Sequence, residues 1–431
     1  MFRSYREVLR VPGGLAFSAS GLVARLPMAL VGLGILLFTS GVTGSYGLAG
    51  VMSATFFLSA AIGMIVSSRL VDRLGQHKVL GWLITGESLG LVLFIITMEL
   101  GWPFVVSAIL AAFAGACSPA IGPAVRARWT YVISNMESKS SPKLRTAFAL
   151  ESISEEIIFT IGPLITAWLA ISVALPAPII FAIVVGMTGT FILIRLRGTE
   201  PTPSPVRQTR EPHIFAFRHP GVFLMVVSAI ATGAIFGSFE VAIVAFTTEL
   251  GAPELSGLLL AAWALTSMFG GLWFGSRHFR APLSRQLVII TAALTLALLL
   301  TLFVHSLLAL SLVIMISGAL VAPVLITIFS LAERLVPNAQ LTEGLTYINS
   351  GLTVGFALGV AVAGYVIDLS GAGLGFAVGV GATGAGFLIS LFGQKRLRSA
   401  VKDYGPIPPT AALNTDPIPG PAPGGFAAEE G

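Results

Sequence analysis

Twelve long apolar stretches follow one another along this chain, and each is long enough to cross a lipid bilayer. A helix that spans the ~30 Å hydrocarbon core needs about 20 such residues. Turn residues, such as Gly251-Ala252-Pro253, or charged residues separate most of the stretches. The stretches cover residues 14–39, 46–68, 79–98, 103–125, 146–171, 177–195, 220–246, 254–276, 285–304, 307–331, 344–367 and 372–393. The sequence therefore predicts an all-α polytopic membrane protein with twelve transmembrane helices.

The composition excludes several other classes of protein. Only 10% of the residues are charged, whereas soluble domains carry roughly 25%. A soluble globule of this composition would lack the polar side chains to cover its surface. The single cysteine excludes a disulfide-bonded secreted scaffold.

Basic residues predict the orientation of the spans. All but one of the 25 Lys and Arg residues lie in the N-terminal segment, after the last span, or in the connections that face the same side. The opposite connections carry Glu99, Glu249, Glu254 and Asp368 instead. Because basic residues stay in the cytoplasm, both termini are predicted to be cytoplasmic, in a cell (inner) membrane. Arg126 and Arg128, at the end of the fourth stretch, are expected to extend to the cytoplasmic interface. The net charge of +5 is then explained by the basic residues that keep these connections in the cytoplasm, and no nucleic-acid partner is expected.

A polar segment divides the twelve stretches into two sets of six. The pattern Gly63-(x4)-Ser68-Arg69 ends the second stretch and Gly271-(x4)-Ser276-Arg277 ends the eighth, at similar positions in the two halves. We therefore predict pseudo-symmetric six-helix bundles at residues 1–196 and 219–396, joined by a cytoplasmic linker at 197–218. Residues 397–431 are rich in Pro, Gly and Ala, which predicts a disordered cytoplasmic tail.

The connection between the second and third stretches carries a recognisable motif. Asp72, Arg73 and Gly75 match the pattern Gly-x-x-x-Asp-Arg-x-Gly, with Ser68 in place of the first glycine and Gln76-His77 in place of a basic pair. In this motif the chain resembles the major facilitator superfamily. The resemblance extends over roughly residues 10–396. The resemblance implies the fold of that family, secondary transport, and a cytoplasmic gate formed by these three residues. An ordinary salt bridge in a loop is the alternative.

A second resemblance concerns the fifth stretch. Gly162-Pro163 matches the centre of a motif that antiporters of the family carry, although Ile158 stands where the motif has an earlier glycine. The family's arginine in the fourth span is replaced by Ala111. The resemblance implies a drug-efflux-like antiporter, and a proline kink that only aids packing is the alternative.

Charged residues inside the spans are candidates for function because each costs ~2.5–3.5 kcal/mol at the bilayer centre. Arg25 lies in the first span, and Glu155 and Glu156 lie at comparable depth in the fifth. Adjacent carboxylates repel, so one of them is expected to bind protons, and Glu155 is preferred because it shares a face with Glu151. Glu151 is expected at the cavity mouth. Glu240 in the seventh span is a candidate for binding a proton or a cationic group. The alternatives are a structural Arg–Glu pair and, for Glu240, a hydrogen bond to a neighbouring helix.

These features predict a monomeric secondary transporter that moves a small organic molecule by alternating access, most simply by proton-coupled efflux. A proton-coupled importer of a sugar or metabolite and a non-transporting membrane sensor are the alternatives. The expected partners are the substrate, protons and the bilayer. No cofactor, metal site or enzymatic activity is expected, since neither a Walker lysine nor a His-Glu-x-x-His pattern occurs.

Overall fold

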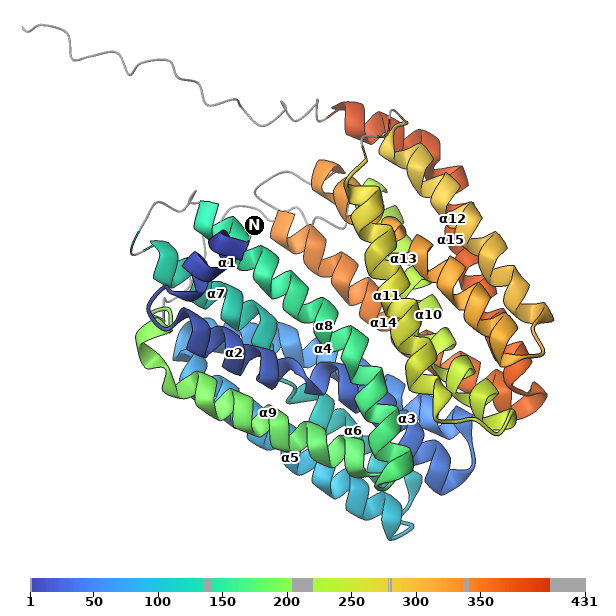
Figure 1. Ribbon diagram of the computed structural model, residues 1–431, viewed down its shortest axis with the longest axis horizontal. Helices are drawn as coiled ribbons and strands as arrows, with labels where there is room; N and C mark the ends of the chain where they lie inside the picture. Colours follow the sequence, from blue (N-terminus) through green and yellow to red (C-terminus); the bar gives the residue numbers. More distant parts are fainter. Residues whose placement is uncertain are drawn as a thin grey trace, which may run out of the picture.

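The computed structural model describes residues 2–134, 136, 142–203, 220–277, 279, 281–335 and 341–403. Regular structure in these segments is entirely helical (Figure 1). The α-helices are α1 (Phe2–Leu9), α2 (Gly14–Arg25), α3 (Pro27–Thr43), α4 (Tyr46–Leu74), α5 (Gln76–Glu99), α6 (Phe104–Ala116), α7 (Ile121–Ser134), α8 (Pro142–Ser172), α9 (Ala177–Arg195), α10 (Pro220–Glu249), α11 (Leu255–Gly275), α12 (Leu283–Leu299), α13 (Leu307–Leu335), α14 (Leu341–Ser370) and α15 (Ala372–Asp403). The predicted tail after residue 403 and the linker from residue 204 onward lie outside the described residues.

Within the described segments, twelve spans are long and apolar enough to cross a membrane, which confirms the predicted number. Several spans extend beyond the predicted stretches. The fourth ends at Ser134 and the last at Leu397. These extra turns carry polar and basic residues, so hydropathy alone ends each span too early.

The first and fourth spans each consist of two helices. The first breaks at Leu26, between α2 and α3, because Pro27 has no backbone N–H to continue the hydrogen-bond ladder. The fourth breaks between α6 and α7, around Pro119. Both breaks lie close to a charged side chain of the same span, Arg25 in the first and Arg126 in the fourth.

Close glycine contacts show that the two halves are built alike. A Cβ atom on Gly63 would lie 2.2 Å from the carbonyl oxygen of Ala116, and one on Gly270 would lie 1.9 Å from that of Ala319. The reciprocal contacts place Gly115 against Phe56 and Gly318 against Trp263. Spans 2 and 4 therefore cross as spans 8 and 10 do, which agrees with two pseudo-symmetric six-helix bundles.

The bundles meet near the start of α4, at the end of the molecule opposite the connection between α4 and α5. We call the end with that connection the basic end. Gly50 of α4 packs so closely on α14 that a Cβ atom would lie 2.6 Å from the carbonyl oxygen of Val360. Below it, the rings of Phe57 and Phe356 have centroids 4.6 Å apart. Gly257 of α11 packs against α8 at Pro163.

Toward the basic end the bundles separate. Residues seven apart share one face of a helix, so the face of α8 that contacts α11 at Pro163 continues through Glu156 and Ala149. Both of these residues are exposed. The face of α4 that contains Phe57 continues in the same way to the exposed Met64 and Ser68. Among the described residues, the two bundles are thus in contact at one end and apart at the basic end.

Apolar packing joins the bundles at the closed end. Two clusters of buried side chains fill the N-terminal bundle, and a third fills the C-terminal bundle. The third cluster also includes Leu33, Leu36 and Ala49 from the first two spans. The contact between the halves is therefore continuous with the core of the C-terminal bundle.

Candidate functional site

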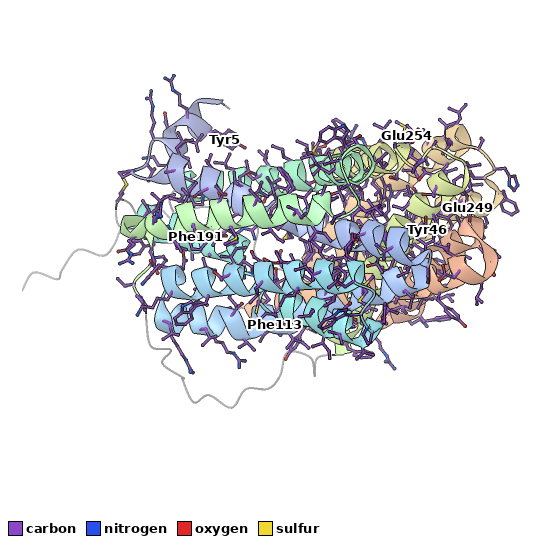
Figure 2. The ribbon with its side chains drawn as sticks, turned by 90° about the horizontal axis from the view of Figure 1, so that it is seen from below. Tyr5, Tyr46, Phe113, Phe191, Glu249 and Glu254 are labelled. Atoms are coloured by element: carbon purple, nitrogen blue, oxygen red, sulfur yellow. The ribbon has the colours of Figure 1, made fainter. Side chains whose placement is uncertain are left out.

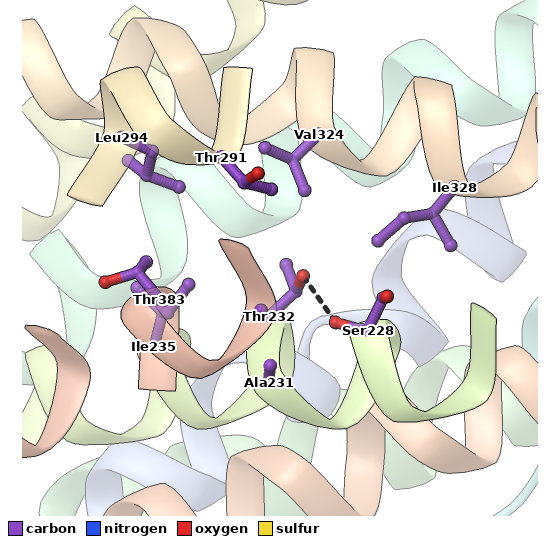
Figure 3. A pocket seen from close by; sticks show the side chains of 10 residues that line it. Ser228, Ala231, Thr232, Ile235, Thr291, Leu294, Val324, Ile328 and Thr383 are labelled. Carbon is purple, nitrogen blue, oxygen red and sulfur yellow. Dashed lines mark hydrogen bonds between the residues drawn. The ribbon is translucent and has the colours of Figure 1, made fainter. Parts of the chain in front are cut away.

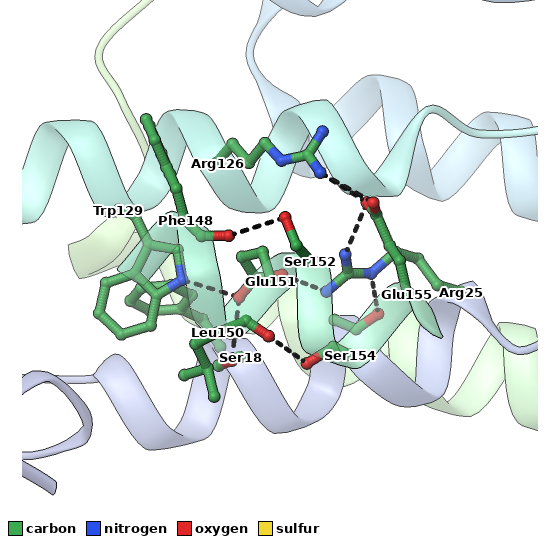
Figure 4. A network of polar contacts seen from close by, with 12 residues as sticks. Ser18, Arg25, Arg126, Trp129, Phe148, Leu150, Glu151, Ser152, Ser154 and Glu155 are labelled. Carbon is green, nitrogen blue, oxygen red and sulfur yellow. Dashed lines mark hydrogen bonds and ion pairs between the residues drawn. The ribbon is translucent and has the colours of Figure 1, made fainter. Parts of the chain in front are cut away.

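Four charged side chains meet inside the N-terminal bundle, and we call them the polar quartet (Figure 4). Arg25 comes from α2, Arg126 from α7, and Glu151 and Glu155 from α8. Arg25 bonds to Glu151 through Nη2 and lies 3.3 Å from Oε1 of Glu155 through Nη1. Nη2 of Arg126 lies 2.9 Å from both carboxylate oxygens of Glu155. Two cations and two anions compensate one another, as buried charges require.

Arg25 is the last residue of α2, and this helix helps to hold its side chain. Its Nε donates to the carbonyl oxygen of Gly21, one turn earlier, at 3.1 Å. Gly21 lets α2 approach α7, since a Cβ atom there would lie 2.5 Å from Val125. Gly122 faces the quartet, and a Cβ atom there would lie 3.4 Å from Oε1 of Glu155. Small residues in α2 and α7 thus bring the charged groups together.

Glu151 is the most enclosed member of the polar quartet, with a side chain that is 0% exposed. Besides the bond from Arg25, Oε1 accepts hydrogen bonds from Oγ of Ser18 at 3.0 Å and from Nε1 of Trp129 at 2.8 Å. The expectation that Glu151 lies at the cavity mouth is wrong, because this face of α8 packs against α2 and α7. Ser18 and Trp129 were not predicted. A tryptophan N–H inside a span is the one sequence signal that could have suggested a partner.

The expectation that Arg126 and Arg128 extend to the cytoplasmic interface is wrong, because both side chains turn toward partners inside the N-terminal bundle. Arg126 turns to Glu155 in the polar quartet. Arg128 is completely buried, where its Nε donates to Gln76 at 2.7 Å and its Nη1 donates to Thr199 at 2.9 Å. Charge placement along the sequence indicates the side of the membrane but does not distinguish these inward orientations.

Glu155 and Glu156 have different surroundings although they are adjacent. Glu155 lies between two arginines, and its side chain is 28% exposed. Glu156 is exposed on the face of α8 that turns toward the other bundle. Within the described residues it has no ion pair or hydrogen bond. Both arginines of the polar quartet contact Glu155 and neither contacts Glu156, whose charge is therefore uncompensated among the described residues.

Glu240 lies on α10 in the C-terminal bundle and is partly buried. It follows Phe236, which packs on Trp263 of α11, by one turn. It also follows Gly237, which packs on Phe356 of α14, by three residues. This spacing places Glu240 on the side of α10 between α11 and α14. In the described part of the chain no hydrogen bond or ion pair reaches its carboxylate.

Gly162 and Pro163 lie where α8 contacts α3 of its own bundle and α11 of the other bundle. A Cβ atom on Gly162 would lie 2.5 Å from Cβ of Ala29 in α3. The carbonyl oxygen of Pro163 faces Gly257 of the other bundle. The Gly-Pro pair therefore marks the crossing of three helices, α3, α8 and α11.

The motif residues Asp72, Arg73 and Gly75 lie at the basic end. Asp72 and Arg73 are exposed, and neither has an ion pair or hydrogen bond to another described residue. Gly75 adopts a φ of +89° between α4 and α5. The carboxylate of Glu200 accepts a hydrogen bond from the backbone N–H of His77 at 3.1 Å, which caps the start of α5.

A small cavity also lies inside the C-terminal bundle, between α10, α12, α13 and α15 (Figure 3). Thr232, Thr291 and Thr383 line it, and each hydroxyl donates to a carbonyl oxygen of its own helix. These groups therefore offer no free donor to a ligand. Among the described residues, no group of three His, Cys, Asp or Glu side chains converges to hold a metal ion.

Several solved structures with the same fold are of membrane transporters. A nucleoside transporter, NupG, is 12% identical with a TM-score of 0.68, and the match covers 90% of this chain and 98% of that one. A peptide transporter, POT, in complex with sulfate is 12% identical with a TM-score of 0.65 over 90% and 95% of the two chains. A bacterial homologue of the iron transporter ferroportin, in an inward-facing state, is 14% identical with a TM-score of 0.65 over 89% and 99%. At these identities the likeness concerns the fold alone.

Sequence comparison identifies the family. Comparison with curated proteins gives no match. The family profile described as Major Facilitator Superfamily matches residues 15–297, which is more than half of the chain. The twelve spans in two bundles, the fold of the solved transporters and this match agree. The chain belongs to the major facilitator superfamily and is a multi-pass membrane transporter.

Proposed function

We propose that the protein is a proton-coupled secondary transporter that exports a small organic molecule across the cytoplasmic membrane. Alternating access requires the two bundles, residues 1–196 and 219–396, to rock around a site between them. The open basic end and the closed opposite end provide one of the two states that this cycle needs. With both termini in the cytoplasm, this state faces inward.

The uncompensated carboxylate of Glu156 is the observation that carries proton coupling. Closure of the basic end would continue the α8–α11 contact from Pro163 toward Glu156, which lies on the same face. A lone carboxylate is costly to enclose between apolar helices. Binding a proton removes this cost, so closure and protonation favour each other. We therefore propose Glu156, in place of Glu155, as the proton acceptor of the N-terminal bundle.

Other candidate residues have supporting roles in this proposal. The polar quartet fixes α2, α7 and α8 relative to one another, so the N-terminal bundle moves as one body. Glu240 provides a second uncompensated carboxylate on the opposite bundle, which binds a proton or the cationic group of a substrate. Gly162 and Pro163 form the pivot between α8 and α11. Asp72, Arg73 and Gly75 form contacts across the basic end when it closes.

Substrate-linked proton movement tests the proposal. Ethidium, nucleosides, amino acids and sugars are first screened for thermal stabilisation of the purified protein. A stabilising compound is then added to proteoliposomes that contain the pH-sensitive dye pyranine. We expect the wild type to move protons opposite to the compound. Glu156→Gln should abolish this proton movement and retain exchange of the compound down its own gradient.

The matched control is Glu254→Gln, which removes an exposed carboxylate at the closed end and should leave proton movement unchanged. Protons that move in the same direction as the compound would establish import and overturn the proposed direction. Full gradient-driven transport by both Glu156→Gln and Glu240→Gln would exclude these carboxylates as the coupling sites.

A further inference from the structure

Asp368, at the closed end of α14, makes three hydrogen bonds to the start of α4. Its Oδ2 accepts from Oγ of Ser45 at 2.5 Å and from the backbone N–H of Gly47 at 2.8 Å. Its Oδ1 accepts from the backbone N–H of Tyr46 at 2.8 Å. We call these four residues the Asp368 contact. All of its bonds pass from the C-terminal bundle to the N-terminal bundle.

The Asp368 contact uses donors that α4 cannot satisfy internally. The first backbone N–H groups of a helix have no partner within it, and together they favour a negative charge at this end. Ser45 caps α4 by accepting from the N–H of Leu48 at 3.0 Å, which leaves its hydroxyl proton for Asp368. Charge-assisted bonds of this kind are stronger than neutral ones.

Close helix packing surrounds the Asp368 contact, although the carboxylate itself is exposed to solvent. A Cβ atom on Gly364 would lie 2.2 Å from the carbonyl oxygen of Tyr46, and one on Gly47 would lie 2.8 Å from Oδ2 of Asp368. The Tyr46 side chain also lies next to Thr248 of α10. Figure 2 places Tyr46 beside Glu249 and far from Tyr5, which lies toward the other end.

A second carboxylate at the same end provides a comparison. Oε1 of Glu249 accepts from the backbone N–H of Ala372 at 2.7 Å and so caps α15. Glu249 and Ala372 both belong to the C-terminal bundle. The bond of Glu249 therefore stabilises one bundle, whereas the bonds of Asp368 must break whenever the bundles separate at this end.

We propose that Asp368 is a positioning residue that holds this end of the transporter closed, and that breaking its bonds to α4 is required to open it. The inference rests on the alternating access described under the proposed function. It assigns no part in proton coupling to Asp368. In the outward-open state water takes the place of these partners on both sides, and the exposed position of Asp368 allows water to compensate part of the lost bonding.

Cysteine accessibility tests this role without a known substrate. Cys117, the only cysteine, is replaced by Ser, and Ala54→Cys introduces a probe. Ala54 is 8% exposed and lies on α4 between the contacts made by Gly50 and Phe57. A membrane-impermeant maleimide reaches it from the closed end only when that end opens. We expect Asp368→Asn to raise the labelling rate at least about fivefold, as loss of charge-assisted bonds predicts.

A second probe, Ser152→Cys on the exposed face of α8, is labelled from the basic end. Asp368→Asn should lower its labelling, because opening one end closes the other. Glu249→Gln is the matched control and should leave both rates unchanged. Ser45→Ala should change both rates in the direction of Asp368→Asn by a smaller factor, and adding it to Asp368→Asn should have no further effect.

Equal labelling of residue 54 in Asp368→Asn and the parent protein would overturn the proposal. An equal rise in Glu249→Gln would also overturn it, because the effect would then be general loosening. If Asp368→Asn does not insert, Ser45→Ala alone decides the outcome by the same criterion. Because no proton flux is measured, these results are independent of whether Glu156 couples transport to protons.

Discussion

Glu151, Glu155 and Glu156 lie within six consecutive residues of α8, yet their environments differ completely. Glu151 is buried with three donors, Glu155 bridges two arginines, and Glu156 is exposed without a partner among the described residues. Helical rotation of 100° per residue explains the difference. It turns Glu151 into the N-terminal bundle and Glu156 toward the opposite bundle.

Replacing Glu151 should therefore destabilise the protein far more than replacing Glu156. Glu151→Gln removes the charge that balances buried Arg25, and breaking a buried pair typically costs about 3–5 kcal/mol. Glu156→Gln alters an exposed side chain and should change stability by less than about 0.5 kcal/mol. Thermal unfolding of the purified variants in detergent measures the difference. A melting temperature of Glu151→Gln equal to that of the wild type would contradict the role of the polar quartet.

The sequence predicts which residues of the site carry charge but not how they pair. Arg25 and the α8 glutamates stand out because charges are rare inside spans. Arg126 did not stand out, because it lies at the end of an apolar stretch where basic residues usually reach the interface. The preference for Glu155 over Glu156 depends on helix rotation relative to neighbouring helices, which a single sequence does not contain.

Glycines determine how closely the helices pack, and their effect depends on position. Gly270 lies at the crossing of α11 and α13, while a Cβ atom on Gly275, at the end of α11, would have nothing within 4 Å. The repeated motifs predicted that spans 2 and 8 are equivalent. In span 8 the motif glycine is Gly271, but its neighbour Gly270 makes the closer contact with α13. The crossing point depends on the partner helix, so the sequence pattern locates it only to within a residue.

Alanine substitutions at these two glycines should have opposite outcomes. Gly270→Ala places a methyl group 1.9 Å from the backbone oxygen of Ala319, so α11 and α13 must separate at a cost of about 1–3 kcal/mol. Gly275→Ala meets no neighbour and favours the helix slightly. Thermal unfolding of the two variants tests this. An equal melting temperature for both would show that α11 and α13 do not cross at Gly270.

At the scale of the whole molecule, the number of spans and the division into two similar bundles follow from the sequence. Hydropathy and turn residues determine the spans, and repeated motifs relate the halves. The sequence does not show which end is closed, because a transporter that alternates between two states has one sequence for both, and such states typically differ by only a few kcal/mol. The Asp368 contact was missed for the same reason, because it joins residues far apart in sequence that meet in one of these states.

The orientation of the molecule in the membrane is the remaining prediction at this scale. Basic residues predict that the connection after α9 is cytoplasmic, whereas Glu254 is the only charged residue in the connection between α10 and α11. In a Cys117→Ser background, Ala252→Cys should be labelled by an impermeant maleimide on intact cells. Thr202→Cys should be labelled only after the membrane is permeabilised, and its labelling after permeabilisation controls for reactivity. Labelling of residue 202 on intact cells would reverse the orientation, and the state described here would then face outward.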